Sequence, residues 1–251
     1  MGKNAMLGFA FLISIPVFVS CQGNPEPKAV LQKGIAAHGG LDAITKPRRG
    51  IVKGSRPKIG GFEMCFEETF DLPKSWKRVT TINKKGKKET LFQLKRDGKL
   101  WQWSEGEVAT PKPDDGRTKP HFELIAILRE LLDDRIKLTA RKGVAVDDRP
   151  TVGFRAKWKD GEGEYYFDRE SGLLVQTNMK ITPEPGVNLD IKVVFRNYKK
   201  IDGLQIPYRL RSYIKGGPKG ADSVLASDLI ISEVKLLKSL PPDAFALPKG
   251  E

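Results

Sequence analysis

The stretch FRNYKKIDGLQIPYRLRSY (195–213) holds two candidate β-strands and the turn between them. Its Asp202-Gly203 pair is typical of tight hairpin turns, whose central residues need a positive φ. After the turn, Ile206, Tyr208 and Leu210 alternate with polar or charged residues, as expected of a strand with one buried face. The stretch therefore predicts an antiparallel hairpin that is covered on one side only.

The same pattern recurs through most of the chain. Alternating segments such as 152–158, 173–181 and 189–195 are separated by Gly-rich or Asp-Gly turn signals. By this pattern we expect about ten or eleven strands. No helix-length segments separate them in the way that a parallel sheet requires, so the sheet should be antiparallel. A single sheet of this size should twist and curl rather than stay flat.

Helical patterns occur at two places. Lys28 to Ala37 has helical composition and ends before Gly39, and Leu41 to Thr45 can form a further short turn of helix. In mid-chain, KPHFELIAILRELLDD (119–134) predicts a helix with a wide apolar stripe. The stripe consists of Leu124, Ile125, Ile127, Leu128, Leu131 and Leu132. We therefore expect a mainly β, α+β fold: one curled sheet that forms an open barrel, with helices in its concavity.

The N-terminus predicts export. Lys3 precedes an apolar run from Leu7 to Val19, which is too short for a membrane-spanning helix but fits a signal peptide over residues 1–20. Phe18-Val19-Ser20-Cys21 resembles the lipobox of bacterial lipoprotein signal peptides, with Phe18 where Leu is usual. The resemblance implies that Cys21 is acylated and that residues 21–27 form a tether. The alternative is ordinary cleavage, with Cys21 lost or idle.

The composition favours an anionic partner. The 251 residues carry a formal net charge of +13, with 39% hydrophobic and 30% charged residues, enough for one β domain over 28–248. Such a charge favours acidic lipid headgroups or an acidic polymer. Nucleic acid is not expected as a partner because an exported protein rarely meets it. A basic surface with no dedicated partner is the alternative, and a monomer is favoured.

Catalytic patterns are sparse. The two histidines, His38 and His121, stand near expected helix ends, where capping or surface roles are common, and Asp168 fits a turn role. No spacing is typical of a zinc site or a phosphate-binding loop. We expect no enzymatic activity, no metal and no cofactor. Cys65 lies in a strand-like stretch, where we expect a small half-buried side chain.

Four segments together carry a family resemblance: AAHGGLDAI (36–44), YYFDRESGLLVQ (165–176), FRNYKKIDGLQIPYRLRSY (195–213) and ISEVKLLKSLPPDAFALP (231–248). Over residues 28–248 the chain resembles the LolA-like superfamily, the outer-membrane lipoprotein-sorting carriers and their lipid-anchored receptor relatives. The resemblance implies an unclosed barrel whose apolar cavity accommodates acyl chains of a lipid or lipoprotein. With an anchored N-terminus, it implies a receptor-like protein on the periplasmic side of the outer membrane.

Two sets of residues are candidates for function. Those expected to line an acyl-chain cavity, each of which could also be ordinary core, are Phe62, Met64, Phe66, Trp101, Trp103, Leu124, Leu128, Leu131, Phe154, Trp158, Val175, Ile191 and Val193. Those expected to form a basic docking face are Arg155, Lys157, Lys192, Arg196, Arg209 and Arg211. A carrier should leave an apolar void beneath helix 119–134. An envelope scaffold with a filled core would instead use the basic face to contact anionic lipid, polymer or protein.

Overall fold

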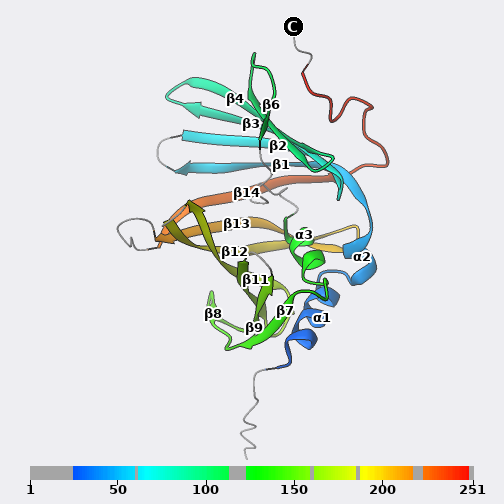
Figure 1. The fold of residues 1–251 in the computed structure, drawn as a ribbon, viewed down its shortest axis with the longest axis vertical. Coiled ribbons are helices and arrows are strands. Elements are labelled where there is room, and N and C mark those ends of the chain that lie inside the picture. Colours follow the sequence, from blue (N-terminus) through cyan, green and yellow to red (C-terminus); the bar gives the residue numbers. More distant parts are fainter. Residues whose placement is uncertain are drawn as a thin grey trace, which may run out of the picture.

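The hairpin at 195–213 lies within one long antiparallel sheet (Figure 1). Its strands are β12 (Val187–Ile201) and β13 (Leu204–Gly216), and they pair from Ile201↔Leu204 outward. Asp202 and Gly203 form the turn with φ values of 47° and 81°, as the turn chemistry predicts. The computed structural model describes residues 25–59, 62–112, 123–158, 161–184, 187–216 and 223–248.

The sheet is open and its strands follow the order β6-β5-β4-β3-β2-β1-β14-β13-β12-β11-β10-β9-β7, with β8 paired to β9. The remaining strands are β1 (Arg48–Ile59), β2 (Phe62–Leu72), β3 (Ser75–Lys84), β4 (Lys87–Arg96), β5 (Lys99–Ser104), β6 (Thr110–Lys112), β7 (Lys137–Arg141), β8 (Ala145–Val146), β9 (Arg149–Trp158), β10 (Gly161–Asp168), β11 (Leu174–Glu184) and β14 (Val224–Leu236). The expected fold class, a mainly β open barrel, is confirmed. The expected count of ten or eleven strands is wrong, because the described residues form fourteen. Strands as short as β6 and β8 cannot show an alternating pattern.

The register sorts the side chains of the sheet onto two faces. The inner face packs against the helices and carries Phe66, Phe154 and Leu210, all of which belong to the buried core. The outer face carries the intervening residues of each strand, such as Arg155 on β9 and Arg211 on β13. This division follows from the two-residue period of a β-strand.

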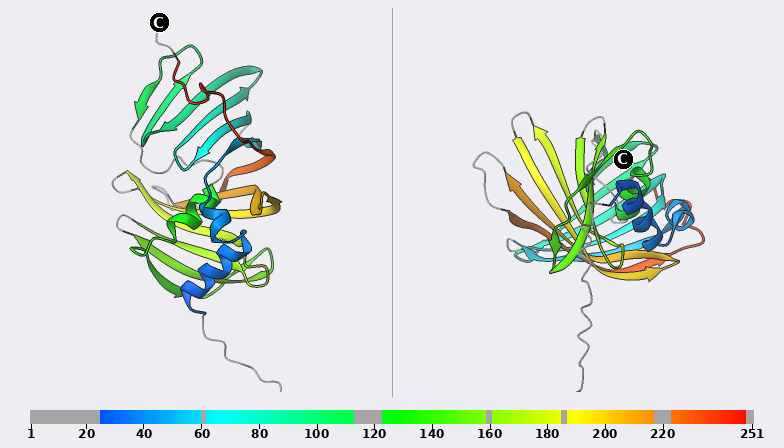
Figure 2. Two further views of the ribbon diagram at one scale, coloured as in Figure 1. Left: turned by 90° about the vertical axis from the view of Figure 1, so that its right-hand side faces the viewer. Right: turned by 90° about the horizontal axis from the view of Figure 1, so that it is seen from below.

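Three helices lie on the inner face near β7 to β13: α1 (Pro27–Ala37), α2 (Leu41–Thr45) and α3 (Glu123–Glu130) (Figure 2). α1 approaches the sheet closely at Gly34, where a Cβ atom would lie 2.4 Å from the ring of Phe167. The two N-terminal helices have the predicted positions. α3 is shorter than the predicted helix, of which residues 119–122 lie outside the described residues.

The C-terminal segment 237–248 runs across the upper strands (Figure 2). Arg96 on β4 donates a hydrogen bond to the Phe245 carbonyl over 3.0 Å, which ties the segment to the outer face. Leu94, on the same face of β4, is fully buried. The upper strands therefore have apolar side chains on both faces.

Several predictions about the N-terminus are left untested. The signal peptide 1–20, Cys21 and the first part of the tether lie outside the described residues, and Pro27, the end of the expected tether, is already the first residue of α1. Among the described helices, none is long and apolar enough to cross a membrane.

Candidate functional site

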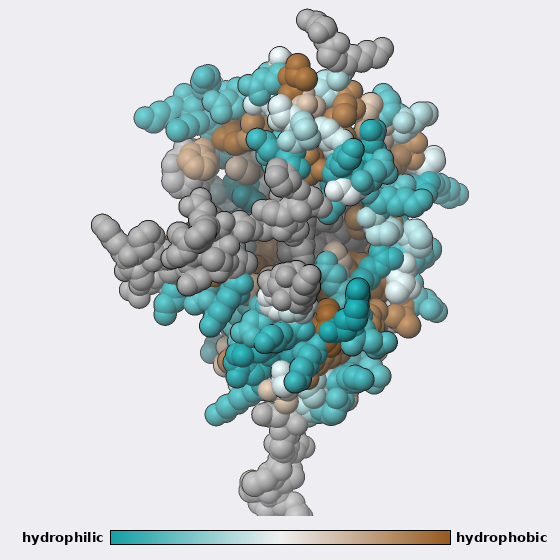
Figure 3. All heavy atoms as spheres, in the orientation of Figure 1, coloured by the Kyte–Doolittle hydropathy of each residue, from teal (hydrophilic) through white to brown (hydrophobic). Residues whose placement is uncertain are grey.

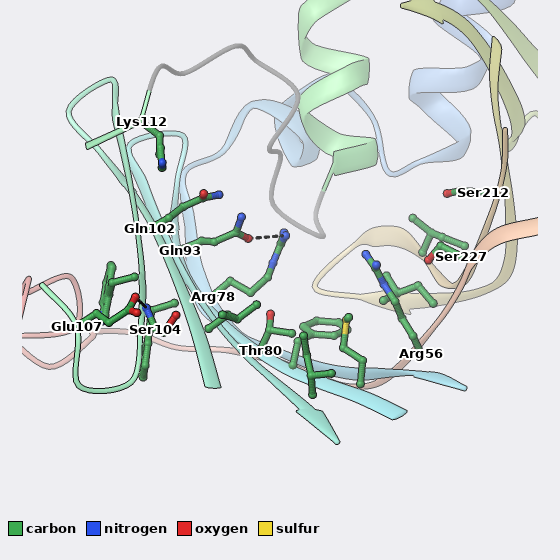
Figure 4. A pocket seen from close by; sticks show the side chains of 18 of the residues that line it. Arg56, Arg78, Thr80, Gln93, Gln102, Ser104, Glu107, Lys112, Ser212 and Ser227 are labelled. Carbon is green, nitrogen blue, oxygen red and sulfur yellow. Dashed lines mark hydrogen bonds between the residues drawn. The ribbon is translucent and has the colours of Figure 1, made fainter. Parts of the chain in front are cut away.

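A cavity of about 700 Å³ opens on the inner face between strands β1 to β6 on one side and β12 to β14 on the other (Figure 4). Among the described lining residues, none belongs to α1, α2 or α3. Its volume lies within the range of about 300–1,000 Å³ that is usual for small-molecule sites. The cavity therefore lies beside the part of the inner face that the helices cover.

Part of the cavity's lining is apolar, and the side chains of this part are called the apolar wall below. It is formed by Met64, Phe66, Ile82, Leu91, Val193, Leu210 and Leu229. These side chains come from strands on both sides of the cavity. Together they offer apolar surface of the kind that flexible acyl chains cover.

Another part of the described lining is polar, whereas the family resemblance implied an apolar cavity. Its side chains are Arg56, Arg78, Thr80, Gln93, Gln102, Ser104, Glu107, Thr110, Lys112, Ser212 and Ser227 (Figure 4). The described part of the lining thus includes three cationic side chains and one acidic one. An amphiphilic ligand fits such a lining better than a hydrocarbon does.

Arg78 is held in place by a fully buried carboxylate. Its Nε and Nη2 atoms donate to Oε2 of Glu68 over 3.0 and 2.7 Å, and its Nη1 donates to Oε1 of Gln93 over 3.4 Å. The exposed fraction of Glu68 is 0%. Because a buried charge is costly without a partner, this pair fixes Arg78 and balances its charge.

Arg56 has a different environment. It lies on β1, half-buried, and no ion pair or hydrogen bond joins its side chain to another residue that the structure describes. The pKa of Arg56 is lowered mainly by burial and, to a smaller extent, by the positive charge of Arg78. Among the residues that the structure describes, the cavity therefore contains a cation whose charge is not balanced by a partner.

The predicted cavity residues other than Trp101 divide into four groups. Met64, Phe66 and Val193 border the cavity from the inner face, and Trp103 also borders it although its position on β5 belongs to the outer face. Leu124, Leu128, Leu131 and Phe154 are buried in the packed core, while Trp158, Val175 and Ile191 are half-buried away from the cavity. Phe62 remains 37% exposed. The expected void beneath the mid-chain helix is filled, since Leu128 is fully buried. Leu132, the last residue of the predicted apolar stripe, is 38% exposed.

Trp101 and Trp103 lie on the opposite face from Met64 and Phe66. The pairings Leu94↔Trp101 and Phe92↔Trp103 place both tryptophans on the outer face, where the Trp103 and Phe92 rings stack 5.1 Å apart. The two tryptophans share one face, but the face that they share is not the inner one. The sequence could not reveal this because both faces of β4 and β5 carry apolar residues.

The six residues of the predicted basic face all lie on the outer face, but most of their charges are paired. Arg155 pairs with Glu164, Arg196 with Asp147, and Arg209 and Arg211 with Asp228. Lys192 lies 4.5 Å from the centre of the Tyr213 ring, and Lys157 is exposed. The outer face therefore carries a network of positively and negatively charged side chains rather than a uniform positive patch. The described part of the face shown in Figure 3 is mostly hydrophilic, with hydrophobic side chains scattered in its upper part and in its lower right half.

Glu164 is the centre of that network. Its carboxylate accepts hydrogen bonds from Tyr166, Arg141 and Arg155. Burial raises the pKa of Glu164, but these hydrogen bonds outweigh burial and lower the pKa to about 2. A hollow of about 400 Å³ lies beside it, with Arg141, Asn178 and Lys192 in its lining.

Two other residues differ from their predicted environments. His38 is the C-cap residue of α1, which is one of the two predicted roles, but it is fully buried rather than at the surface, and its Nδ1 atom lies 2.7 Å from the Gly34 carbonyl. Cys65 is exposed rather than half-buried because its position on β2 belongs to the outer face. In the part of the chain that the structure describes, no three His, Cys, Asp or Glu side chains are grouped so that they could hold a metal ion.

Comparison with solved structures finds proteins that are similar to this chain in fold. A LolA superfamily protein from Nitrosomonas europaea aligns with a TM-score of 0.53 and 13% identity, over 87% of this chain and 96% of that one. An outer membrane lipoprotein-sorting protein domain from Vibrio parahaemolyticus aligns with a TM-score of 0.48 and 10% identity, over 87% of this chain and 95% of its own. A DUF1329 family protein from Desulfovibrio piger gives a TM-score of 0.49 and 12% identity, over 87% and 96%.

The chain therefore has a LolA-like fold, as the resemblance implied. No protein-family model matches its sequence, and no curated protein matches it. At this level of identity the likeness concerns the fold, so any function must be argued from the site.

Proposed function

We propose that the mature chain is an exported, lipid-anchored protein of the cell envelope that holds an acyl chain of a lipid or lipoprotein in its half-barrel. The cavity on the inner face carries this proposal. It has an apolar wall, it is open between two groups of strands, and the helices leave it unfilled. In this role the protein binds and transfers a ligand without altering it.

The attachment to the membrane is part of the proposal. The lipobox-like Phe18-Val19-Ser20-Cys21 supports acylation of Cys21, and the residues before α1 then act as a tether. A Cys21→Ser variant should be secreted but should leave the membrane fraction, and it should lack the mass of the attached lipid. Retention of the variant in the membrane would contradict the proposed anchor without affecting the proposed cavity.

Native mass spectrometry of the domain from residue 25 onward, purified from cells, tests the cavity. We expect additional mass that disappears on denaturation and that belongs to an acyl lipid. An unliganded mass, with no uptake of added fatty acid or monoacylglycerol, would contradict the proposal. That result would favour the alternative of an envelope scaffold, which the filled core beneath α3 supports.

A further inference from the structure

We infer that the cavity selects an acyl ligand with an anionic headgroup, and that Arg56 binds this headgroup together with the hydroxyl groups of Ser212 and Ser227. This inference rests on the proposed function and names its ligand class. The headgroup is a carboxylate or a phosphate, both of which match the planar donors of a guanidinium group. The acyl chain would lie on the apolar wall.

The balance of charge in the cavity supports an anion. Among the lining residues Arg56, Arg78 and Lys112 are cationic and Glu107 is acidic. Glu68, next to the cavity, neutralises Arg78. Among the described residues, with Glu68 included, one positive charge therefore remains in excess. The pKa of Arg56 is lowered because burial and the neighbouring positive charge of Arg78 both disfavour its charged form.

The contrast between the two arginines shows which one is available to a ligand. Arg78 directs three of its nitrogen atoms at Glu68 and Gln93. Arg56 makes no such bond to a described residue, although its side chain lies in the same cavity (Figure 4). A guanidinium group that has left bulk water without a partner is stabilised strongly by an incoming anion. Arg56 is therefore the residue that gains most from binding.

The two serines lie where they can complete the site. Ser212 and Ser227 are directly opposite each other on β13 and β14, and Ser55↔Ile230 places Arg56 on the next strand, diagonally from Ser227. All three side chains lie on the inner face and line the cavity at one end (Figure 4). Neither hydroxyl group forms a hydrogen bond with another side chain in the described residues. Two hydroxyl donors beside a guanidinium group form a site suited to oxyanions.

The apolar wall begins next to this polar end. Leu210 and Leu229 are paired across β13 and β14, one step along from the serines, and Phe66 faces Gly54 on β1. A headgroup at Arg56 would therefore leave its acyl chain in contact with these side chains. An amphiphile can contact both Arg56 and the apolar wall. A free anion would gain no binding free energy from the apolar wall, so the site favours the amphiphile.

The test compares myristate with monomyristoylglycerol, which has the same chain but no charge. Binding to the domain from residue 25 onward is measured by calorimetry. We expect wild type to prefer myristate, and Arg56→Met to weaken myristate binding about tenfold or more while changing monomyristoylglycerol binding less than twofold. Arg56→Lys, which keeps the charge, should retain part of the preference. Inorganic phosphate alone should bind far more weakly than myristate.

Lys53→Met is the matched control, because Lys53 lies on the same strand but on the outer face, 3.1 Å from Glu67. It removes the same charge and should leave both affinities unchanged. If Arg56→Met does not fold, the double variant Ser212→Ala, Ser227→Ala tests the same site and should selectively weaken myristate binding. Equal affinity of wild type for the two ligands would overturn the inference and leave the proposed function intact. Failure to bind either ligand would contradict both.

Discussion

Arg56 and Arg78 show how the surroundings of a residue, rather than its type, decide its role. Both are arginines on the inner face, and both line the same cavity. Arg78 is neutralised by a carboxylate that is fully buried, whereas Arg56 has no described partner. Alternation along β1 and along β3 indicates which face of the sheet each arginine lies on. It cannot reveal which of the two has a partner on a neighbouring strand.

The Glu68–Arg78 pair should matter for stability much more than an exposed pair does. Glu68→Gln would leave the Arg78 charge nearly buried, so we expect a loss of about 3–5 kcal/mol in the free energy of unfolding. The neighbouring Glu67→Gln removes an exposed partner of Lys53 and should cost about 0–1 kcal/mol. Urea unfolding of the two variants measures the difference. Similar losses for both would show that burial of Glu68 has no special effect.

His38 should make the protein less stable in mild acid. Its Nδ1 atom donates to the Gly34 carbonyl, while Nε2 is buried without a hydrogen-bond partner near the Tyr198 ring. Burial is the main cause that lowers the pKa of His38 from 6.5 to about 4, although the bond to Gly34 raises it. Because the unfolded chain binds the proton more readily, this stability is complete above pH 6.5 and is lost as the pH falls towards 4.

The expected loss between pH 7.5 and pH 5 is about 2 kcal/mol from this residue. It should be visible as a lower urea midpoint at pH 5. His38→Gln should lower stability at both values but should remove most of the pH dependence. Carboxyl groups such as Glu164, whose pKa is lowered from 4.5, contribute mainly below this window. A wild type equally stable at pH 7.5 and pH 5 would show that His38 is not held in its neutral form.

At the scale of elements, the turn residues and the long alternating segments predicted the positions of helices and strands, whereas very short strands could not be predicted. The Asp202-Gly203 turn, the two N-terminal helices and the long alternating strands are all where the sequence predicts them. β6 and β8 were missed because three and two residues are too few to show a period. Trp101 and Trp103 were expected to line the cavity, but both lie on the outer face, which carries apolar residues because the C-terminal segment covers part of it; only Trp103 of the two borders the cavity in the described lining.

The mid-chain helix α3 should stabilise the fold through its packed stripe. Leu128 is fully buried in the core, whereas Leu132, just beyond the helix, is 38% exposed. We expect Leu128→Ala to cost about 2–5 kcal/mol, since the surrounding side chains cannot fully close the cavity that it leaves. Leu132→Ala should cost less than about 1 kcal/mol. Thermal and urea unfolding followed by circular dichroism compare them, and equal costs would contradict the packing of this helix.

At the scale of the whole molecule, the architecture could be predicted further than the site. Alternation and turns predict a long antiparallel sheet, and the family resemblance implies that it stays open. The position of the cavity depends on how far the helices extend over the inner face, which no local pattern encodes. Helices α1 to α3 fill the part beside β7 to β13, and the polar side chains of β3 to β5 come from positions that look ordinary in sequence.

The cavity itself leads to a test that separates a carrier from a filled scaffold with a single pair of variants. Thr80 and Thr81 are neighbours on β3 and both are half-buried, but Thr80 lines the cavity and Thr81 faces outward, opposite Cys65. Thr80→Trp places an indole in the cavity without disturbing the core beneath α3. We expect it to reduce uptake of myristate at least tenfold in native mass spectrometry while the protein remains folded by circular dichroism.

Thr81→Trp adds the same side chain to the opposite face and should bind myristate as the wild type does. Reduced uptake in both variants would indicate general disruption of β3 rather than a blocked cavity. Full uptake in Thr80→Trp would mean that the acyl chain lies elsewhere, and the hollow beside Glu164 on the outer face would be the next site to block. Because the two variants share a strand, a residue type and a degree of burial, only the face of the sheet separates them. A selective loss in Thr80→Trp would therefore assign acyl binding to the inner side of the half-barrel.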